Sequence, residues 1–219
     1  MGVKGIFQAN ATTLILLIVV NLTLSLTGET IWIIVSVLAL LGMVFFSVRQ
    51  GMNIGHGACG ISNTVERARA SGESVYNQLD SSYLNQVWSV QTGIRGLLAS
   101  ALIPYAVGAV YIILTLLWQS HPGLETATVI ARVAAWVISI PYWPIIMHWH
   151  ESFVNLTPAI VIMLMVSPFA LPLCTFIGYM QGPRLWSRTE EAMKQGRRRA
   201  KARARVGKKI APRTQKPEI

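Results

Sequence analysis

Four stretches of the sequence are apolar over a length that suits a membrane crossing, and they constrain the fold more than any other feature. A transmembrane helix needs about 20 consecutive, mainly apolar residues. Within lipid the backbone must satisfy its own hydrogen bonds, which a helix does. The sequence therefore predicts four transmembrane helices, at Phe7 to Leu26, Ile31 to Val48, Ile94 to Trp118 and Leu156 to Met180.

A fifth apolar stretch, from Ala127 to Trp149, is interrupted. Arg132 enters it early, and Pro141 and Pro144 each remove a backbone hydrogen bond. An arginine at mid-membrane costs about 2.5 to 3.5 kcal/mol on insertion scales. This stretch is either a kinked fifth span or a re-entrant segment that enters the membrane and returns, and the sequence leaves both open. The predicted fold class is an all-α polytopic integral membrane protein with five apolar segments.

Composition supports a membrane protein over a soluble domain. The chain is 53% hydrophobic, and only 13% of its residues are charged, against about 25% in soluble domains. A soluble fold of this length would lack charged surface. The two cysteines, Cys59 and Cys174, lie far apart in the sequence and predict no disulfide framework.

The net charge of +10 lies in the C-terminal tail. Basic and acidic residues balance in residues 1–180, whereas residues 181–219 contain thirteen basic and three acidic residues. Basic segments favour the cytoplasmic side of a membrane, so we expect a cytoplasmic C-terminus, in a bacterial cytoplasmic membrane. A re-entrant 127–149 would place the N-terminus, the 49–93 loop and the tail together; a spanning one would separate the loop from the tail.

The spans divide the chain into four predicted regions. Hydropathy and charge both change at their boundaries. The regions are an N-terminal transmembrane hairpin (1–48), an extramembrane loop (49–93), a C-terminal transmembrane region (94–180) and a polybasic tail (181–219).

The loop of residues 49–93 is predicted to contain helical structure. Its four glycines between positions 51 and 60 suggest a flexible exit from the second span. Asn63 and Glu66 have the spacing of a capping box, so a helix should begin at Asn63. From Val75 to Trp88, apolar residues recur every three or four positions, which indicates an amphipathic helix. This helix would lie on the membrane, dock a partner, or pack on the protein's own surface.

The polybasic tail holds the main candidate binding site. Gln181, Gly182 and Pro183 should end the last span, and residues 187–205 favour a separate helix. Basic residues near a membrane gain about 1 kcal/mol each from anionic headgroups, so we prefer anionic lipid as the ligand. Nonspecific contact with nucleic acid or the ribosome, or with an acidic protein, is the alternative. The candidate binding residues are Arg197, Arg198, Arg199, Lys201, Arg203, Arg205, Lys208 and Lys209.

A second candidate is a polar membrane site around the interrupted stretch. The histidines do not have the i, i+4 spacing of a zinc-protease helix, and we predict no metal or cofactor. The simpler interpretation is that the arginine reaches the headgroups and the other residues are solvated at a membrane boundary. The candidate residues are Arg132, His148, His150 and Glu151.

Prolines concentrate in the last two apolar segments, and this guides the functional alternatives. Pro158, Pro168 and Pro172 should bend the last span and free backbone carbonyls, so a cavity is expected in the C-terminal half. No catalytic constellation is apparent, and we expect a non-enzymatic scaffold or accessory subunit that associates with itself or with another membrane protein. The alternatives are a small transporter or channel subunit using the Pro-broken helices and Arg132, and a ribosome-associated insertion or translocation factor.

Overall fold

The computed structural model describes residues 2–24, 29–70, 86–142 and 156–210, and all regular structure within them is helical. Four helices are long and apolar enough to cross a membrane. The all-α class and the four predicted helices of spanning length are thus confirmed. These helices are α1 (Gly2–Leu24), α2 (Glu29–Ala70), α5 (Val90–Trp118) and α8 (Pro158–Ile210).

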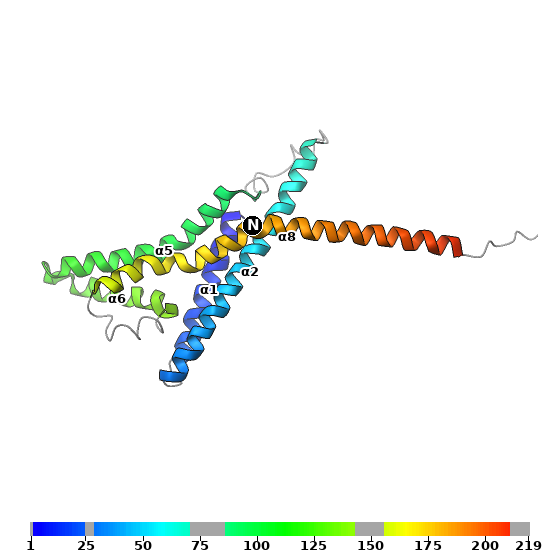
Figure 1. Ribbon diagram of the computed structural model, residues 1–219. Coiled ribbons are helices and arrows are strands. Elements are labelled where there is room, and N and C mark those ends of the chain that lie inside the picture. The colour runs from blue at the N-terminus through cyan, green and yellow to red at the C-terminus, as the bar shows by residue number, and fades with distance from the viewer. Residues whose placement is uncertain (1, 25–28, 71–85, 143–155, 211–219) are drawn as a thin grey trace, which may run out of the picture.

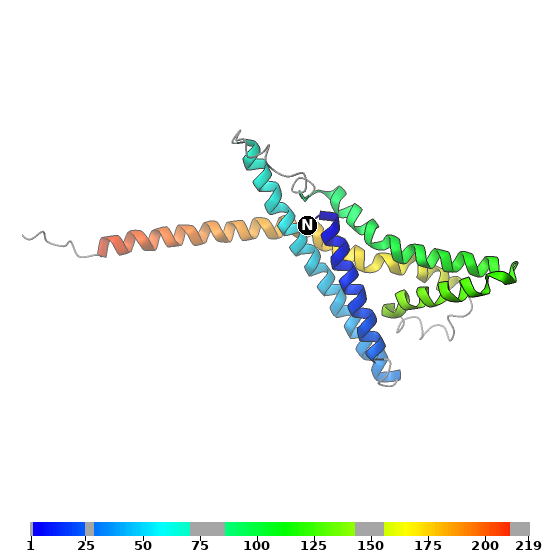
Figure 2. The same cartoon turned by 180° about the vertical axis from the view of Figure 1, so that it is seen from behind.

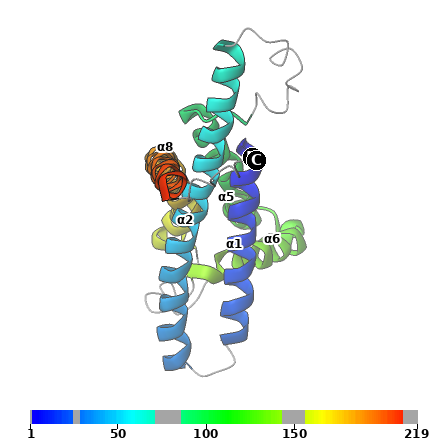
Figure 3. The same cartoon turned by 90° about the vertical axis from the view of Figure 1, so that its right-hand side faces the viewer.

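The four long helices form two arms that cross near the N-terminus (Figure 1). Helices α1 and α2 make the first arm and run side by side as a hairpin (Figure 3). The second arm contains α5 and the first half of α8, which pack together as antiparallel helices: Gly93, at the start of α5, faces Phe176 and Tyr179, whereas Gly108 faces Leu164. The two arms meet where α2 crosses α8.

A small apolar core holds the two arms together where they cross. Ile6 of α1, Ala58 of α2 and Tyr179 of α8 are buried in one cluster, and Trp88, just before α5, packs against it. We call this cluster the junction. The start of α1, the second half of α2, the start of α5 and the second half of α8 therefore all lie at this end of the molecule.

The interrupted apolar stretch forms a short helix against the second arm. A 3-10 turn, η1 (Pro122–Leu124), leads into α6 (Glu125–Ser139), and a second one, η2 (Ile140–Tyr142), follows it. Helix α6 has 15 residues, about 22 Å at 1.5 Å per residue, which is shorter than the bilayer core of about 30 Å. It packs beside α5, and its Ala131 and Ala135 share a buried cluster with Tyr111.

The end of α6 turns toward the first arm. Helix α6 stops at Ser139, and Pro141 lies buried in η2, close to where the sequence predicts an interruption. Ile140 of η2 is buried against Ile18 of α1 and Met163 of α8. This contact links α6 to both arms.

Two predicted helix boundaries are wrong. The glycines from Gly51 to Gly60 do not form a flexible exit, and no new helix begins at Asn63, because α2 continues unbroken to Ala70. The residues from Gln181 to Pro183 do not end the helix that contains the last span, because α8 continues to Ile210. In both places the crossing helices pack on the glycines, and this tertiary packing outweighs weak local propensity.

The predicted amphipathic helix of residues 75–88 lies mostly outside the described residues. Its last two members, Val87 and Trp88, are described and are not helical. Trp88 instead belongs to the junction.

Candidate functional site

Paired glycines allow α2 and α8 to cross at backbone contact. Gly51 and Gly55 lie one turn apart on α2, and Gly178 and Gly182 lie one turn apart on α8. A Cβ atom added at Gly51 would lie 2.9 Å from the carbonyl carbon of Thr175, and one added at Gly178 would lie 2.8 Å from that of Val48. Both distances are too short for a real side chain. The crossing is therefore a small-xxx-small contact of the kind that brings membrane helices close together.

Trp88 completes the hydrogen bonding of α8 beside this crossing. Pro183 has no N–H, so the carbonyl of Tyr179, four residues earlier, lacks its usual helical donor. The indole Nε1–H of Trp88 donates to that carbonyl at 3.4 Å. The Trp88 and Tyr179 rings stack with centroids 6.2 Å apart. This arrangement lets α8 pass through Pro183 without leaving a buried carbonyl unpaired.

The segment before α5 is fixed to both crossing helices. The Trp88 backbone N–H donates to Ser62 Oγ of α2 at 3.0 Å, and the Ser89 N–H donates to Tyr179 Oη of α8 at 3.2 Å. Ser89 also caps α5, because its Oγ accepts from the Thr92 N–H at 3.0 Å. The junction is thus a hydrogen-bonded unit as well as an apolar one.

A buried polar triad joins three of the long helices. Asn10 Nδ2 of α1 donates to Ser100 Oγ of α5 at 3.1 Å, and Thr175 Oγ1 of α8 donates to Asn10 Oδ1 at 2.7 Å. All three side chains are buried. Inside a membrane, lipid tails are as apolar as the helix surfaces, so the hydrophobic effect does not drive the helices together. Hydrogen bonds between helices, such as those of this triad, help to hold the bundle together instead.

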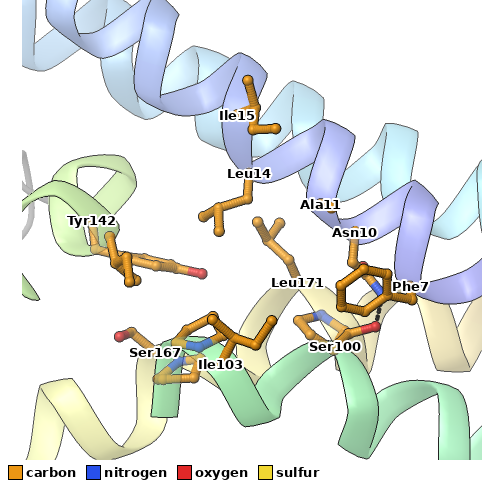
Figure 4. Close-up of a pocket in the computed structure, with 14 residues that line it drawn as sticks. Phe7, Asn10, Ala11, Leu14, Ile15, Ser100, Ile103, Tyr142, Ser167 and Leu171 are labelled. Atoms are coloured by element: carbon orange, nitrogen blue, oxygen red, sulfur yellow. Dashed lines mark hydrogen bonds between the residues drawn. The ribbon is translucent and has the colours of Figure 1, made fainter. Parts of the chain in front are cut away.

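A cavity of about 260 Å³ lies between the two arms, next to this triad. It is enclosed by α1, α5, the end of α6 with η2, and α8 (Figure 4). The predicted cavity of the C-terminal half is present in part, because Pro168 and Pro172 line this space together with residues of α1. The lining residues are Phe7, Asn10, Ala11, Leu14, Ile15, Ser100, Ile103, Pro104, Ile138, Tyr142, Ser167, Pro168, Leu171 and Pro172.

Two hydroxyl groups lie at the η2 end of the cavity. Figure 4 shows the Tyr142 hydroxyl directed into the space and the Ser167 hydroxyl nearby, whereas Asn10 and Ser100 lie at the other end. The Asn10 and Ser100 side chains are already bonded to each other. The rest of the wall is mainly aliphatic or aromatic carbon.

From Glu191 onward, α8 is an isolated basic helix. It projects away from all other helices (Figure 2), and every residue from 191 to 201 is exposed. Lys194, Arg197, Arg198 and Lys201 follow the i, i+3, i+4, i+7 spacing, so they lie on one side of the helix. We call these four residues the basic stripe. Arg199 lies away from it.

An ion pair ties the base of this projecting helix to α2. Glu190 lies 3.1 Å from Lys194 Nζ and 3.8 Å from the guanidinium of Arg67. The two basic side chains are largely exposed, whereas that of Glu190 is partly buried. Exposed pairs of this kind contribute little free energy, but these two mark where α8 leaves α2.

The remaining predicted tail residues lie on the same helix. Arg203, Arg205, Lys208 and Lys209 fall within α8, whose backbone is helical to Ile210. The predicted cluster is therefore brought onto one continuous helix with the last span.

The predicted polar membrane site is not assembled within the described residues. Arg132 lies half-buried on α6, does not line the cavity between the arms, and has no hydrogen-bond partner for its Nε atom among the described residues. His148, His150 and Glu151 lie outside the described residues. Over the described part of the chain, no group of three or more His, Cys, Asp or Glu side chains is placed to hold a metal ion.

Sequence reasoning missed the glycine pairs, the polar triad and the role of Trp88. The GxxxG spacing at Gly51 and Gly178 was a usable signal, because this motif is typical of membrane helix contacts. Asn10 was a second signal, since an amide inside an apolar span needs a partner. Trp88 carried no comparable signal, because its partner lies 91 residues away.

Comparisons of the chain with protein-family models, with curated proteins and with solved structures find no match.

Proposed function

We propose that this protein is a non-enzymatic membrane scaffold that uses the projecting half of α8 to bind an anionic surface. The observation that carries the proposal is the continuity of α8. One helix contains a span and an exposed basic stripe. A partner held by the stripe would therefore be coupled directly to the membrane-embedded part.

The projecting helix is assigned to the cytoplasmic face. The junction places the start of α1, the end of α2 and the second half of α8 at one end of the molecule. Most of the basic residues belong to segments at this end, and basic segments favour the cytoplasm. Four spans, with α6 entering the membrane without crossing it, agree with this distribution.

Anionic lipid headgroups of the same bilayer are the first candidate surface. Exposed Arg184 and Arg188 lie within five residues after Pro183, and basic residues close to headgroups gain about 1 kcal/mol each. The basic stripe would add to this attraction if α8 leans toward the membrane. The crossing of the two arms (Figure 1) means that α2 and α8 cannot both stand upright in the bilayer.

The length of the projecting helix favours a second candidate, a ribosome or another large polyanion. Arg197 lies fourteen residues beyond Pro183, which is about 21 Å along a helix at 1.5 Å per residue. Electrostatic attraction is screened over about 8 Å at physiological salt. If α8 stands upright, the basic stripe is too far from its own headgroups and is available to a separate polyanion.

Energy transfer between the helix and lipid headgroups tests the first candidate. Full-length protein carrying Cys59→Ala, Cys174→Ala and a donor dye on Ala200→Cys is placed in nanodiscs with headgroup-labelled acceptor lipid. Lipid binding predicts greater transfer in phosphatidylglycerol discs than in phosphatidylcholine discs. The difference should disappear in about 1 M salt, where the screening length is about 3 Å.

Charge variants make this test specific to the basic stripe. The stripe variant carries Arg197→Gln, Arg198→Gln and Lys201→Gln and leaves the Lys194–Glu190 pair intact. The control removes three charges elsewhere, at Arg199 and, beyond the end of α8, at Arg213 and Lys216. The second candidate predicts equal energy transfer in both disc types. It also predicts that the protein co-sediments with ribosomes in a salt-sensitive way and that the stripe variant does not. No effect in either assay would refute both.

A further inference from the structure

The cavity between the two arms lies at the middle depth of the helices that form it. Its wall includes Leu14 of α1, Pro104 of α5 and Pro168 of α8, which lie near the middle of the apolar part of each helix. The surroundings at this depth are hydrocarbon when the helices cross a bilayer. Any occupant therefore comes from the lipid phase or through it.

Two of the side chains that line the cavity also belong to the exposed apolar surface of the helices. Ile15 of α1 and Ile103 of α5 line the cavity and are also 60% and 56% exposed. Figure 4 shows them on opposite sides of the space. These two side chains give the cavity an apolar border that is exposed to the membrane.

The chemistry of the wall selects hydrocarbon over water. Asn10 and Ser100 are hydrogen-bonded to each other and the asparagine also to Thr175, so that end of the cavity is already satisfied. Apolar cavities of about 150 Å³ stay dry and bind benzene-sized molecules. The 260 Å³ here is enough for a segment of an alkyl chain.

We propose that this cavity is a binding site for the hydrocarbon chain of a membrane lipid, which enters between Ile15 and Ile103. The chain fills the space between the arms and contacts the proline-rich wall formed by Pro104, Pro168 and Pro172. This site is independent of the basic stripe and of any surface that the stripe binds.

A photoreactive lipid tests the proposal. Full-length protein is reconstituted in phosphatidylcholine vesicles that contain a trace of phosphatidylcholine with a diazirine midway along one acyl chain. After irradiation, crosslinked residues are located by mass spectrometry. The expected result is enrichment on the cavity residues Ile15 and Ile103 over residues of similar exposure elsewhere, such as Ile113.

Two matched tryptophan variants separate the cavity from the general lipid-facing surface. Ile103 is 56% exposed and lines the cavity, whereas Ile113 is 54% exposed on the same helix and does not. Ile103→Trp places a larger side chain at the cavity and should weaken lipid binding there. Crosslinking of the other cavity residues should then fall about tenfold. Ile113→Trp should leave it unchanged.

Three results would overturn the proposal. The first is crosslinking spread evenly over exposed apolar residues and unchanged by Ile103→Trp. The second is reaction of Ser167→Cys with a membrane-impermeant thiol reagent, in a background lacking Cys59 and Cys174, because that would mean a water-filled cavity. The third is loss of crosslinking in Tyr142→Phe with unchanged thermal stability, because the occupant would then be recognised by a polar group and not by its hydrocarbon.

Discussion

The indole N–H of Trp88 donates to the backbone carbonyl of Tyr179, the one carbonyl that Pro183 deprives of its helical donor. A side chain outside the long helices thereby supplies the hydrogen bond that a proline removes inside α8. The continuity of α8 from the span to the basic stripe depends on this point, because an unpaired buried carbonyl would favour a break in the helix.

A double-mutant cycle tests this relationship. Trp88→Phe keeps an aromatic ring but removes the donor, and the unpaired carbonyl should cost about 1 to 3 kcal/mol. In a Pro183→Ala background the backbone N–H at position 183 can bond to Tyr179 instead, so Trp88→Phe should cost less. The coupling free energy is measured from thermal unfolding in detergent. Equal costs in both backgrounds would mean that Trp88 acts only through packing.

The glycine crossing makes a second prediction, with a control on the same helix. Gly178→Ala places a methyl group against the Val48 backbone and should destabilise the fold and separate the arms. Gly196 has no heavy atom within 4 Å of an added Cβ, so Gly196→Ala should be neutral or stabilise α8 by up to about 1 kcal/mol through helix propensity. Thermal unfolding measures both variants. A stable, unchanged Gly178→Ala protein would contradict the close crossing.

The polar triad makes a third prediction. Thr175→Val removes the hydroxyl that bonds Asn10 on another helix, and interhelical bonds in membranes contribute about 0.6 kcal/mol on average and up to about 1.7 kcal/mol. Thr115 is also buried, but within the described residues its hydroxyl bonds to the Tyr111 carbonyl of its own helix and to no other helix. Thr115→Val should therefore cost less than Thr175→Val in the same unfolding assay. The reverse order would mean that the triad does not hold the bundle together.

The spans were predictable because a membrane crossing needs a long apolar run, and that property is local in the sequence. The end of α5 at Trp118 agrees with its predicted end. The two wrong helix boundaries depend instead on contacts between residues that are far apart in the sequence. Whether a glycine-rich stretch such as Gly51 to Gly60 bends or stays helical depends on what packs against it, and the partner, α8, lies more than 100 residues away.

The residues of the candidate sites also differ in whether they could be predicted from the local sequence. The basic residues were found from charge alone, because a charged cluster needs no partner to be recognised. The cavity was expected from Pro168 and Pro172, but the sequence did not show that Asn10 and Ile15 of α1 would form its other wall. That contact depends on how the two arms cross, and the crossing is a tertiary property.

Side-specific cysteine labelling provides the last prediction, which concerns the membrane topology. In a Cys59→Ala, Cys174→Ala background, single cysteines are placed at three positions. These are Ala70 at the end of α2, Gly123 in η1 and Ile210 at the end of α8. The antiparallel packing of α5 and α8 predicts that positions 70 and 210 react from one side, and position 123 from the other. Under the positive-inside rule, positions 70 and 210 face the cytoplasm.

This experiment also decides the role of α6. If the segment between α5 and α8 crossed the membrane, three spans would separate position 70 from position 210, and the two would react from opposite sides. That outcome would reject the four-span arrangement and would place either the end of α2 or the basic stripe outside the cell. Reaction from the same side leaves α6, about 22 Å long, as a segment that enters the bilayer and returns. Arg132 then lies near the outer interface, where it reaches headgroups and does not cross the hydrocarbon core.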